Sequence, residues 1–253
     1  MNYSPLRYSG GKSKIAPLIR TIMQTSNNTH TTYIEPFAGG SGVALNLLLE
    51  GYVNHIVIND YDKAIYSFWR ALKDDPWGFL ELLDTTPLSI DEWQRQKEIY
   101  TAKNKRYSLE LGFAAFYLNR TNRSGILSAG PIGGYAQTGS YDISARFNRA
   151  ALTAKIQDII AHRNQIDIYN KEVRSFIQRM IPQYRLITSG KRPTGKTTSY
   201  VNTEGMHALL PSAEVEVYKK KYKTSHKQFD KYFMFIEQAI KDQRKWLGML
   251  YCT

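Results

Sequence analysis

Cysteine is nearly absent from this chain of 253 residues, in which Cys252 is the only one. A single thiol excludes a disulfide framework and a cysteine-based zinc cluster within one chain. Long apolar runs are missing too, since none approaches the ~20 residues of a membrane span. The opening "MNYSPLRYSGGK" lacks the hydrophobic core of a secretion signal. We therefore expect a cytoplasmic protein with no membrane segment and no metal site.

Acidic residues are scarce relative to basic ones. The chain has 34 Lys and Arg against 22 Asp and Glu, a formal charge of +12 and a pI near 9.6. This excess favours a polyanionic partner such as nucleic acid, although charge that serves solubility alone would give the same balance. Hydrophobic residues make up 42% of the chain, enough for a sizeable folded core.

The apolar pattern alternates between strands and helices in the first part of the chain. It predicts a strand at 33–39, a helix at 41–52, a second strand at 55–60, and two helices within 62–84 that break at Asp75-Pro76. This order is typical of an α/β fold with a doubly wound parallel sheet.

The strand signal then fades, which predicts a mainly helical domain at 65–165 inserted into a core formed by 1–64 and 166–253. A strand and a helix are predicted at 166–181, and a long helix that leads into a terminal strand at 226–251. Residues 183–217 have no clear period and are rich in Ser, Thr, Gly and Lys, so we predict a loop there.

A glycine turn, "FAGGSG" at 37–42, joins the first strand to the helix that follows. Glycines there allow backbone N–H groups and a helix N-terminus to approach a ligand, although the same residues also serve plain tight turns. Asp60 follows about 20 residues later at the end of the second strand, where a carboxylate can bind both hydroxyls of a ribose. Taken together, the two features indicate a ligand that contains adenosine.

Several segments resemble the adenine-specific DNA N6-methyltransferases of the DNA adenine methylase type. They are, in chain order, "RYSGGKSK", "EPFAGGSG", "VINDYD", "LNRTNRSGILSAGPIGG" and "RFN". The resemblance implies a methyltransferase-like α/β fold with an inserted DNA-recognition domain. It also implies S-adenosylmethionine as cofactor, double-stranded DNA as partner and adenine N6 as methyl acceptor. An RNA-modifying enzyme is a weaker alternative, because the recognition loop resembles those of duplex DNA readers.

The resemblance also implies roles for individual residues. Asp60 would bind the ribose of the cofactor, and Tyr8 and Lys12 would contact it, although a lysine near a helix start is often merely solvated. Phe37, Ala38 and Gly39 would cradle the cofactor's methionine end, and Pro36 and Gly40 beside them are further candidates for cofactor binding.

Arginine and asparagine side chains gather in and beside the glycine-rich loop, and both types make bidentate contacts to base edges. The candidates for DNA binding are Asn119, Arg120, Asn122, Arg123, Arg146 and Asn148, with Arg149 beside them. A solvated helix face or hydrogen bonds within the domain would use the same residues. Tyr117, Tyr135 and Phe147 either fill the space left by a flipped base or belong to the core, which we favour.

The catalytic motif of the family, Asp-Pro-Pro-Tyr, is not found. The chain has no Pro-Pro pair, and its only Asp-Pro lies in the helical stretch at 75–76. The motif is expected within 183–217, where "MHALLPSAEV" offers Pro211 without a preceding acid or a following aromatic. Either activity is lost, which would leave a DNA- and cofactor-binding module, or another residue such as Glu204, Glu214 or Glu216 replaces the motif. A frame disruption in the gene would explain the local loss of pattern.

Overall fold

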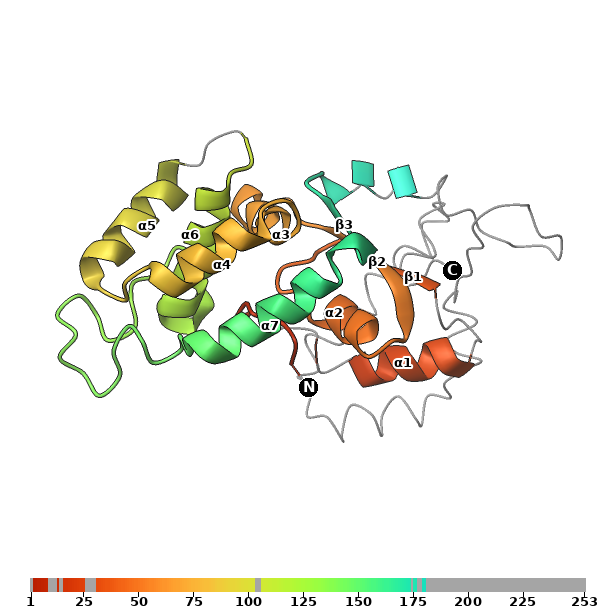
Figure 1. The fold of residues 1–253 in the computed structure, drawn as a ribbon, viewed down its shortest axis with the longest axis horizontal. Coiled ribbons are helices and arrows are strands. Elements are labelled where there is room, and N and C mark those ends of the chain that lie inside the picture. Colours follow the sequence, from red (N-terminus) through yellow and green to blue (C-terminus); the bar gives the residue numbers. More distant parts are fainter. Residues whose placement is uncertain are drawn as a thin grey trace, which may run out of the picture.

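The computed structural model describes residues 2–8, 13, 16–25, 31–102, 106–173, 175, 176, 179 and 180. A parallel sheet lies beside a group of helices (Figure 1). Its strands are β1 (Thr31–Glu35), β2 (Val53–Asn59) and β3 (Ile166–Tyr169), in the order β1-β2-β3. The helices are α1 (Ala16–Thr25), α2 (Gly42–Leu49), α3 (Lys63–Asp74), α4 (Pro76–Thr85), α5 (Ile90–Ala102), α6 (Leu109–Thr121) and α7 (Arg149–Ala161). The predicted loop at 183–217 and helix at 226–251 lie outside the described residues.

The sheet is buried on both faces. Ile34 and Val57 on one face pack with Phe176 and Met180, which follow β3. The other face belongs to a larger core that also includes residues of α1 and α2. Covered faces on both sides are typical of parallel sheets, and they explain the apolar run at the centre of β2. The parallel sheet was predicted correctly, while further strands of a doubly wound sheet stay a prediction.

The helices begin and end largely where the sequence places them. The Asp62 carboxylate caps α3 by accepting the N–H of Ala64 at 2.8 Å, and Asp75 caps α4 by accepting the N–H of Gly78 at 3.1 Å. Pro76 occupies the first position of α4, where its missing N–H costs nothing. The predicted break between two helices at Asp75-Pro76 is therefore confirmed. Helix α7 was not predicted as a separate element.

Helix α3 packs against both the sheet and the other helices. Its Phe68 ring stacks on Phe116 of α6 with 5.9 Å between ring centroids, and Phe79 of α4 meets both rings edge-on. Its Lys73 donates to the Ile166 carbonyl of β3. One continuous core thus extends from the sheet to α6 and α7, and the predicted boundary near residue 65 falls inside α3. In the described ranges, no helix has both the length and the apolar character to cross a bilayer.

Candidate functional site

The glycine turn after β1 folds over the edge of the sheet where the strands end. Ala38 donates its backbone N–H to the Asn59 carbonyl at 2.8 Å, and the buried Asn59 amide donates to the Pro36 carbonyl at 3.0 Å. Gly39 has a φ of +46°, and a Cβ at this position would lie 3.0 Å from the Tyr8 ring. The turn therefore needs glycine at 39, both for its backbone conformation and for the close approach of Tyr8.

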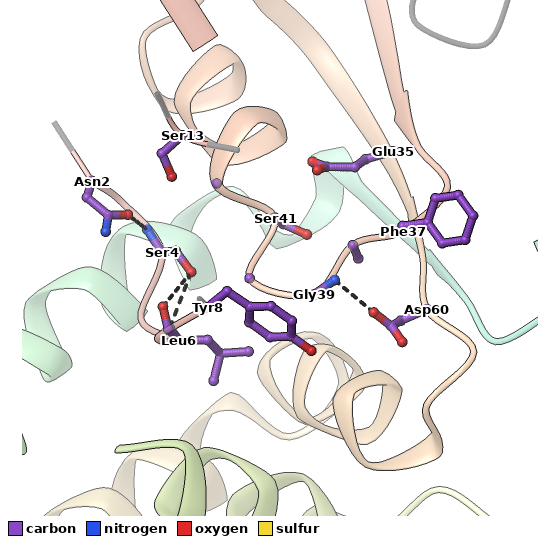
Figure 2. A pocket seen from close by; sticks show the side chains of 13 residues that line it. Asn2, Ser4, Leu6, Tyr8, Ser13, Glu35, Phe37, Gly39, Ser41 and Asp60 are labelled. Carbon is purple, nitrogen blue, oxygen red and sulfur yellow. Dashed lines mark hydrogen bonds between the residues drawn. The ribbon is translucent and has the colours of Figure 1, made fainter. Parts of the chain in front are cut away.

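Asp60 joins the turn to the end of β2. Its Oδ2 accepts the Gly39 N–H at 2.7 Å, and its Oδ1 accepts the Asp62 N–H at 2.9 Å (Figure 2). Each carboxylate oxygen has two lone pairs, so both can still accept a hydrogen bond from a ligand hydroxyl. Asp60 thus lies beside the turn, as its spacing predicts.

Helix α3 supports the turn from the other side. The Trp69 indole N–H donates to the Gly39 carbonyl at 3.0 Å, and the Trp69 side chain is buried. Both backbone polar groups of Gly39 are therefore bonded within the chain, which fixes the turn before any ligand arrives.

The N-terminal segment 2–8 forms the opposite wall of the site. The Tyr8 ring lies beside the glycines of the turn, and 46% of the residue is exposed (Figure 2). Partial burial, together with the nearby charges of Asp60 and Asp62, raises the pKa of Tyr8 to about 12. The hydroxyl is therefore neutral at physiological pH and can donate a hydrogen bond.

These walls enclose a pocket of about 270 Å³. Of the residues predicted to hold a cofactor, Tyr8, Phe37, Ala38, Gly39, Gly40 and Asp60 line it. Pro36 lies behind the turn, with its carbonyl bonded to Asn59. Lys12 lies outside the described residues. Asn2, Ser4, Leu6, Ser13, Glu35, Ser41 and Gly42 complete the lining and were not predicted.

Three of the unpredicted lining residues, Ser4, Glu35 and Ser41, carry buried polar groups. Ser41 is 1% exposed, and within the described part of the chain its hydroxyl has no hydrogen-bond partner. Glu35 is 4% exposed, and its Oε2 accepts the Ala44 N–H at 3.2 Å. Glu35 ends β1 much as Asp60 follows β2, so its position at a strand end was a usable signal. Nothing in the sequence marks Ser41, because burial of a hydroxyl depends on the tertiary fold.

Asn119 and Asn122, which were predicted to contact DNA, are buried. Asn119 accepts the Arg7 N–H at 2.6 Å and donates to the Arg7 and Gly125 carbonyls, both at 2.8 Å. Asn122 accepts the Trp93 indole N–H at 2.6 Å and donates to two carbonyls of the loop that follows. Each of these amides already makes three hydrogen bonds within the protein, so this geometry does not favour their contact with base edges.

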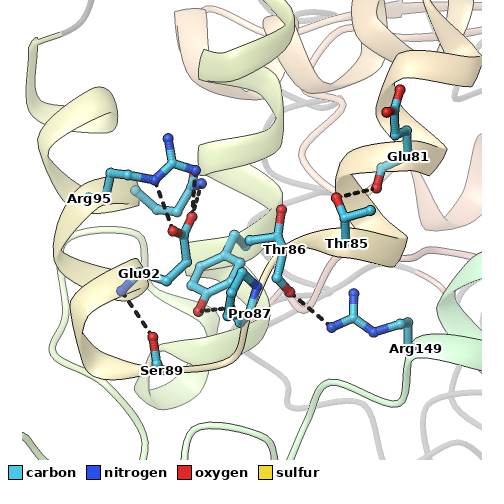
Figure 3. A network of polar contacts seen from close by, with 10 residues as sticks. Glu81, Thr85, Thr86, Pro87, Ser89, Glu92, Arg95 and Arg149 are labelled. Atoms are coloured by element: carbon cyan, nitrogen blue, oxygen red, sulfur yellow. Dashed lines mark hydrogen bonds and ion pairs between the residues drawn. The ribbon is translucent and has the colours of Figure 1, made fainter.

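Asn148 and Arg149 make contacts that stabilise helix ends. The exposed Asn148 caps α7 by accepting the Ala151 N–H at 3.0 Å. The Arg149 guanidinium donates to the Leu83 carbonyl and, at 2.9 Å, to the Thr86 carbonyl at the end of α4 (Figure 3). Helix capping accounts for both residues without a ligand.

The other predicted arginines differ in exposure. Arg123 is exposed in the loop after α6, and Arg146 is exposed just before α7. Arg120 is half-buried, and its guanidinium donates to the Arg146 carbonyl and, at 3.5 Å, to the Pro5 carbonyl. Arg123 and Arg146 are therefore the arginines among the predicted DNA contacts whose side chains lie at the surface.

The three aromatic residues considered for the flipped base also differ in exposure. Tyr117 and Phe147 are buried with 5.8 Å between ring centroids, and the Tyr117 hydroxyl donates to the Pro87 carbonyl at 3.0 Å. Both belong to the core. Tyr135 is 63% exposed and meets the Trp93 ring edge-on at 5.6 Å.

The segment in which the catalytic motif was expected, 183–217, lies outside the described residues, as do Glu204, Glu214 and Glu216. In the part of the chain that the structure describes, no three histidine, cysteine or acidic side chains group in a way that could hold a metal ion.

A parallel sheet with a pocket at the end of its strands is consistent with a methyltransferase-like fold. The sequence model of the D12 class N6 adenine-specific DNA methyltransferases matches residues 8–180, more than half of the chain. The chain therefore belongs to this family, as its motifs indicate. Methyltransferases of this kind generally use S-adenosylmethionine.

Named relatives include three proteins of related function. The type II methyltransferase M.MjaIII of Methanocaldococcus jannaschii is 24% identical over 216 residues, which cover 78% of this chain and 72% of that protein. The modification methylase StsI of Streptococcus sanguinis is 28% identical over 225 residues, 81% of this chain and 32% of that protein. The type II restriction enzyme and methyltransferase RM.Eco57I of Escherichia coli is 55% identical over 42 residues, 17% of this chain and 4% of that protein. The chain thus spans a minor part of the last two.

Proposed function

We propose that this chain binds S-adenosylmethionine in the pocket at the strand ends and binds double-stranded DNA through residues 65–165. The family reaction is methyl transfer from this cofactor to adenine N6. The observation that carries the proposal is the Asp60 carboxylate bonded to the Gly39 N–H at 2.7 Å. This contact places a strand-end acid beside a glycine turn, an arrangement in which the acid can bind the ribose of an adenosine ligand.

The lining residues fit such a cofactor. Asp60 would accept hydrogen bonds from the ribose hydroxyls, and the Ser41 hydroxyl, buried without a partner in the described part, would gain one from a polar group of the ligand. The Glu35 carboxylate would favour the positively charged methionine end. When bound, the cofactor supplies a methyl group on a sulfonium. The chain itself would bind and orient that group.

Methyl transfer by this chain is proposed to be weak or absent. An acid or amide and a neighbouring carbonyl must accept the amino hydrogens of the flipped adenine and direct its lone pair at the methyl group. The sequence lacks Asp-Pro-Pro-Tyr, which supplies these acceptors in the family. The loss of such positioning contacts costs on the order of 10²-fold in rate for each element. The second candidate, a non-catalytic cofactor- and DNA-binding module, therefore rests on this missing motif.

The test measures binding apart from chemistry. Calorimetry with S-adenosylmethionine is expected to show binding that Asp60→Ala weakens by ~1.5–3 kcal/mol, the scale for hydrogen bonds to a charged group. Asp84→Ala, which removes an exposed carboxylate of α4, is the matched control and is expected to bind as the unmutated protein does. Absence of binding by the unmutated protein would refute the cofactor proposal.

A labelled methyl-transfer assay on mixed-sequence duplex DNA then separates the two candidates. Little or no N6-methyladenine is expected even with both ligands bound. Robust methylation would refute the loss of activity and would make Glu204, Glu214 and Glu216 the first acceptors to test. Writing Asp-Pro-Pro-Tyr into 209–212 is expected to restore methylation, and a folded but inactive variant would contradict the placement of the motif there.

A further inference from the structure

Three arginines interact electrostatically where segment 2–8 lies against the end of α6 and the residues just before α7. Arg7 donates to the Asn122 carbonyl at 3.1 Å. Arg120 donates to the Arg146 carbonyl and to the Pro5 carbonyl. We call Arg7, Arg120 and Arg146 the arginine cluster. The backbone carbonyls hold the Arg7 and Arg120 guanidinium groups in place.

The arginine cluster has no acidic partner in the described part of the chain. Burial and the charge of Arg146 lower the pKa of Arg7. Burial, then the charges of Arg7 and Arg146, lower the pKa of Arg120 to about 10. Lys155 adds a further cation, because burial and the charge of Arg120 lower its pKa as well. Guanidinium groups keep their charge in proteins, so the mutual repulsion of the cluster is a cost that a bound anion would remove.

One side of Arg120 also lacks a partner. Its buried Nε–H donates no hydrogen bond to any group of the described residues. Buried guanidinium groups normally have their N–H groups satisfied. Uncompensated charge and an unused donor in one place indicate an anion site.

We propose that the arginine cluster binds one phosphodiester group of the DNA backbone. The inference rests on the proposed DNA function and adds a contact to it. A guanidinium fork matches two phosphate oxygens, and Arg146 is exposed at the surface of the cluster. Arg7 lies between Leu6 and Tyr8, which line the pocket. A flipped adenine that approaches the pocket along this wall would bring its own backbone near the cluster.

This assignment changes the role predicted for Arg120 and Arg146. Arg120 donates N–H groups to two protein carbonyls. It therefore lacks the free pair of N–H groups needed for a bidentate contact with a guanine edge. A fixed charge of this kind positions the duplex without reading its sequence. The contact should therefore be the same for every DNA sequence.

The test compares the unmutated protein with Arg146→Gln. The Arg146 side chain is exposed, so its loss should not prevent folding. DNA affinity is measured on two unrelated duplexes over a range of salt concentrations. We expect Arg146→Gln to weaken binding to both by about tenfold at low salt, the scale for one charge-assisted hydrogen bond. The slope of log K against log salt should fall by about one unit, as for one phosphate contact. Arg146→Lys, which keeps the charge, should retain the slope.

Arg179→Gln is the matched control, because Arg179 is an exposed arginine that lies outside residues 65–165. Unlike Arg146→Gln, this control should leave both the DNA affinity and the slope of log K against log salt unchanged. An effect of Arg146→Gln on one duplex only would show a base contact and overturn the proposal, as would an unchanged slope. A loss of S-adenosylmethionine affinity with unchanged DNA affinity would assign the cluster to the cofactor carboxylate instead. Absence of DNA binding by the unmutated protein would refute the DNA function itself, a result distinct from failure of Arg146→Gln to alter binding.

Discussion

The indole N–H of Trp69 donates to the Gly39 carbonyl at 3.0 Å and so ties α3 to the glycine turn. Trp69→Phe removes the donor and leaves that carbonyl unsatisfied. We expect a loss of ~1–3 kcal/mol in the free energy of unfolding, measured by urea denaturation. We also expect weaker S-adenosylmethionine binding by calorimetry, because the turn loses its support.

Trp93→Phe is the control for this change. Trp93 is also buried, and its indole N–H donates to Asn122 rather than to the turn. The control should lose stability but keep cofactor affinity. Equal cofactor affinities for the two variants would contradict a specific role of Trp69 in supporting the turn.

Two glycines with positive φ allow the effect of backbone strain to be distinguished from the effect of a close contact with the Tyr8 ring. Gly39→Ala introduces a Cβ 3.0 Å from the Tyr8 ring at a φ of +46°, whereas Gly51→Ala has a φ of +75° and nothing within 4 Å. Each change should cost ~1–2 kcal/mol of stability for the left-handed backbone. Only Gly39→Ala should also weaken cofactor binding, as measured by titration calorimetry. A comparable loss of affinity in Gly51→Ala would show that the effect is global.

Asn148 is expected to affect stability more than DNA binding. Asn148→Ala removes the cap of α7 and should lower the free energy of unfolding by ~0.5–2 kcal/mol, while Asn148→Ser should restore most of it. Duplex affinity, measured by fluorescence anisotropy, should stay within twofold of the unmutated protein for both. A large loss of DNA affinity in the stable Asn148→Ser variant would instead restore Asn148 as a DNA contact.

Asp167 should make the free energy of unfolding depend on pH. The hydrogen bond from His55 and the charge of Lys73 hold the pKa of Asp167 below its ordinary value of 3.8. A carboxyl with a depressed folded-state pKa stabilises the fold above its unfolded pKa and loses that contribution as pH falls through the folded one. Asp167→Asn should therefore cost ~0.2–1 kcal/mol at pH 7, because the pair is partly exposed, and little below pH 3. Denaturation from pH 7 to pH 2 measures this, with Glu98→Gln on α5 as control, and a difference that does not change with pH would contradict it.

The predictable part of the site depends on short stretches of sequence. The strand, the glycine turn and the helix after it follow from residues within one segment, and Asp60 follows from its place at the end of β2. Its neighbour in space, the Gly39 N–H, is near because parallel strands end at the same edge. Such features need no knowledge of distant packing.

The DNA-facing residues could not be predicted in the same way. An asparagine that contacts a base and one that holds a loop look alike in sequence, and Asn119 is distinguished only by its contacts with Arg7, 112 residues away. The arginine cluster depends on the same long-range contact. For α7 a signal existed, since the cap at Asn148 precedes apolar residues at helical spacing, Leu152, Ile156 and Ile159.

Segment 2–8 contacts basic side chains on one side and lines the pocket on the other. Lys155 donates to the Asn2 carbonyl at 2.6 Å and Arg120 to the Pro5 carbonyl, while Ser4, Leu6 and Tyr8 face the pocket. A ligand that binds on one side and orders segment 2–8 lowers the entropic cost of binding the other ligand. Thermodynamic reciprocity then requires that the two affinities rise by the same factor. The segment would thereby make cofactor and DNA heterotropic effectors of one another, with a coupling free energy that a pair of titrations can measure.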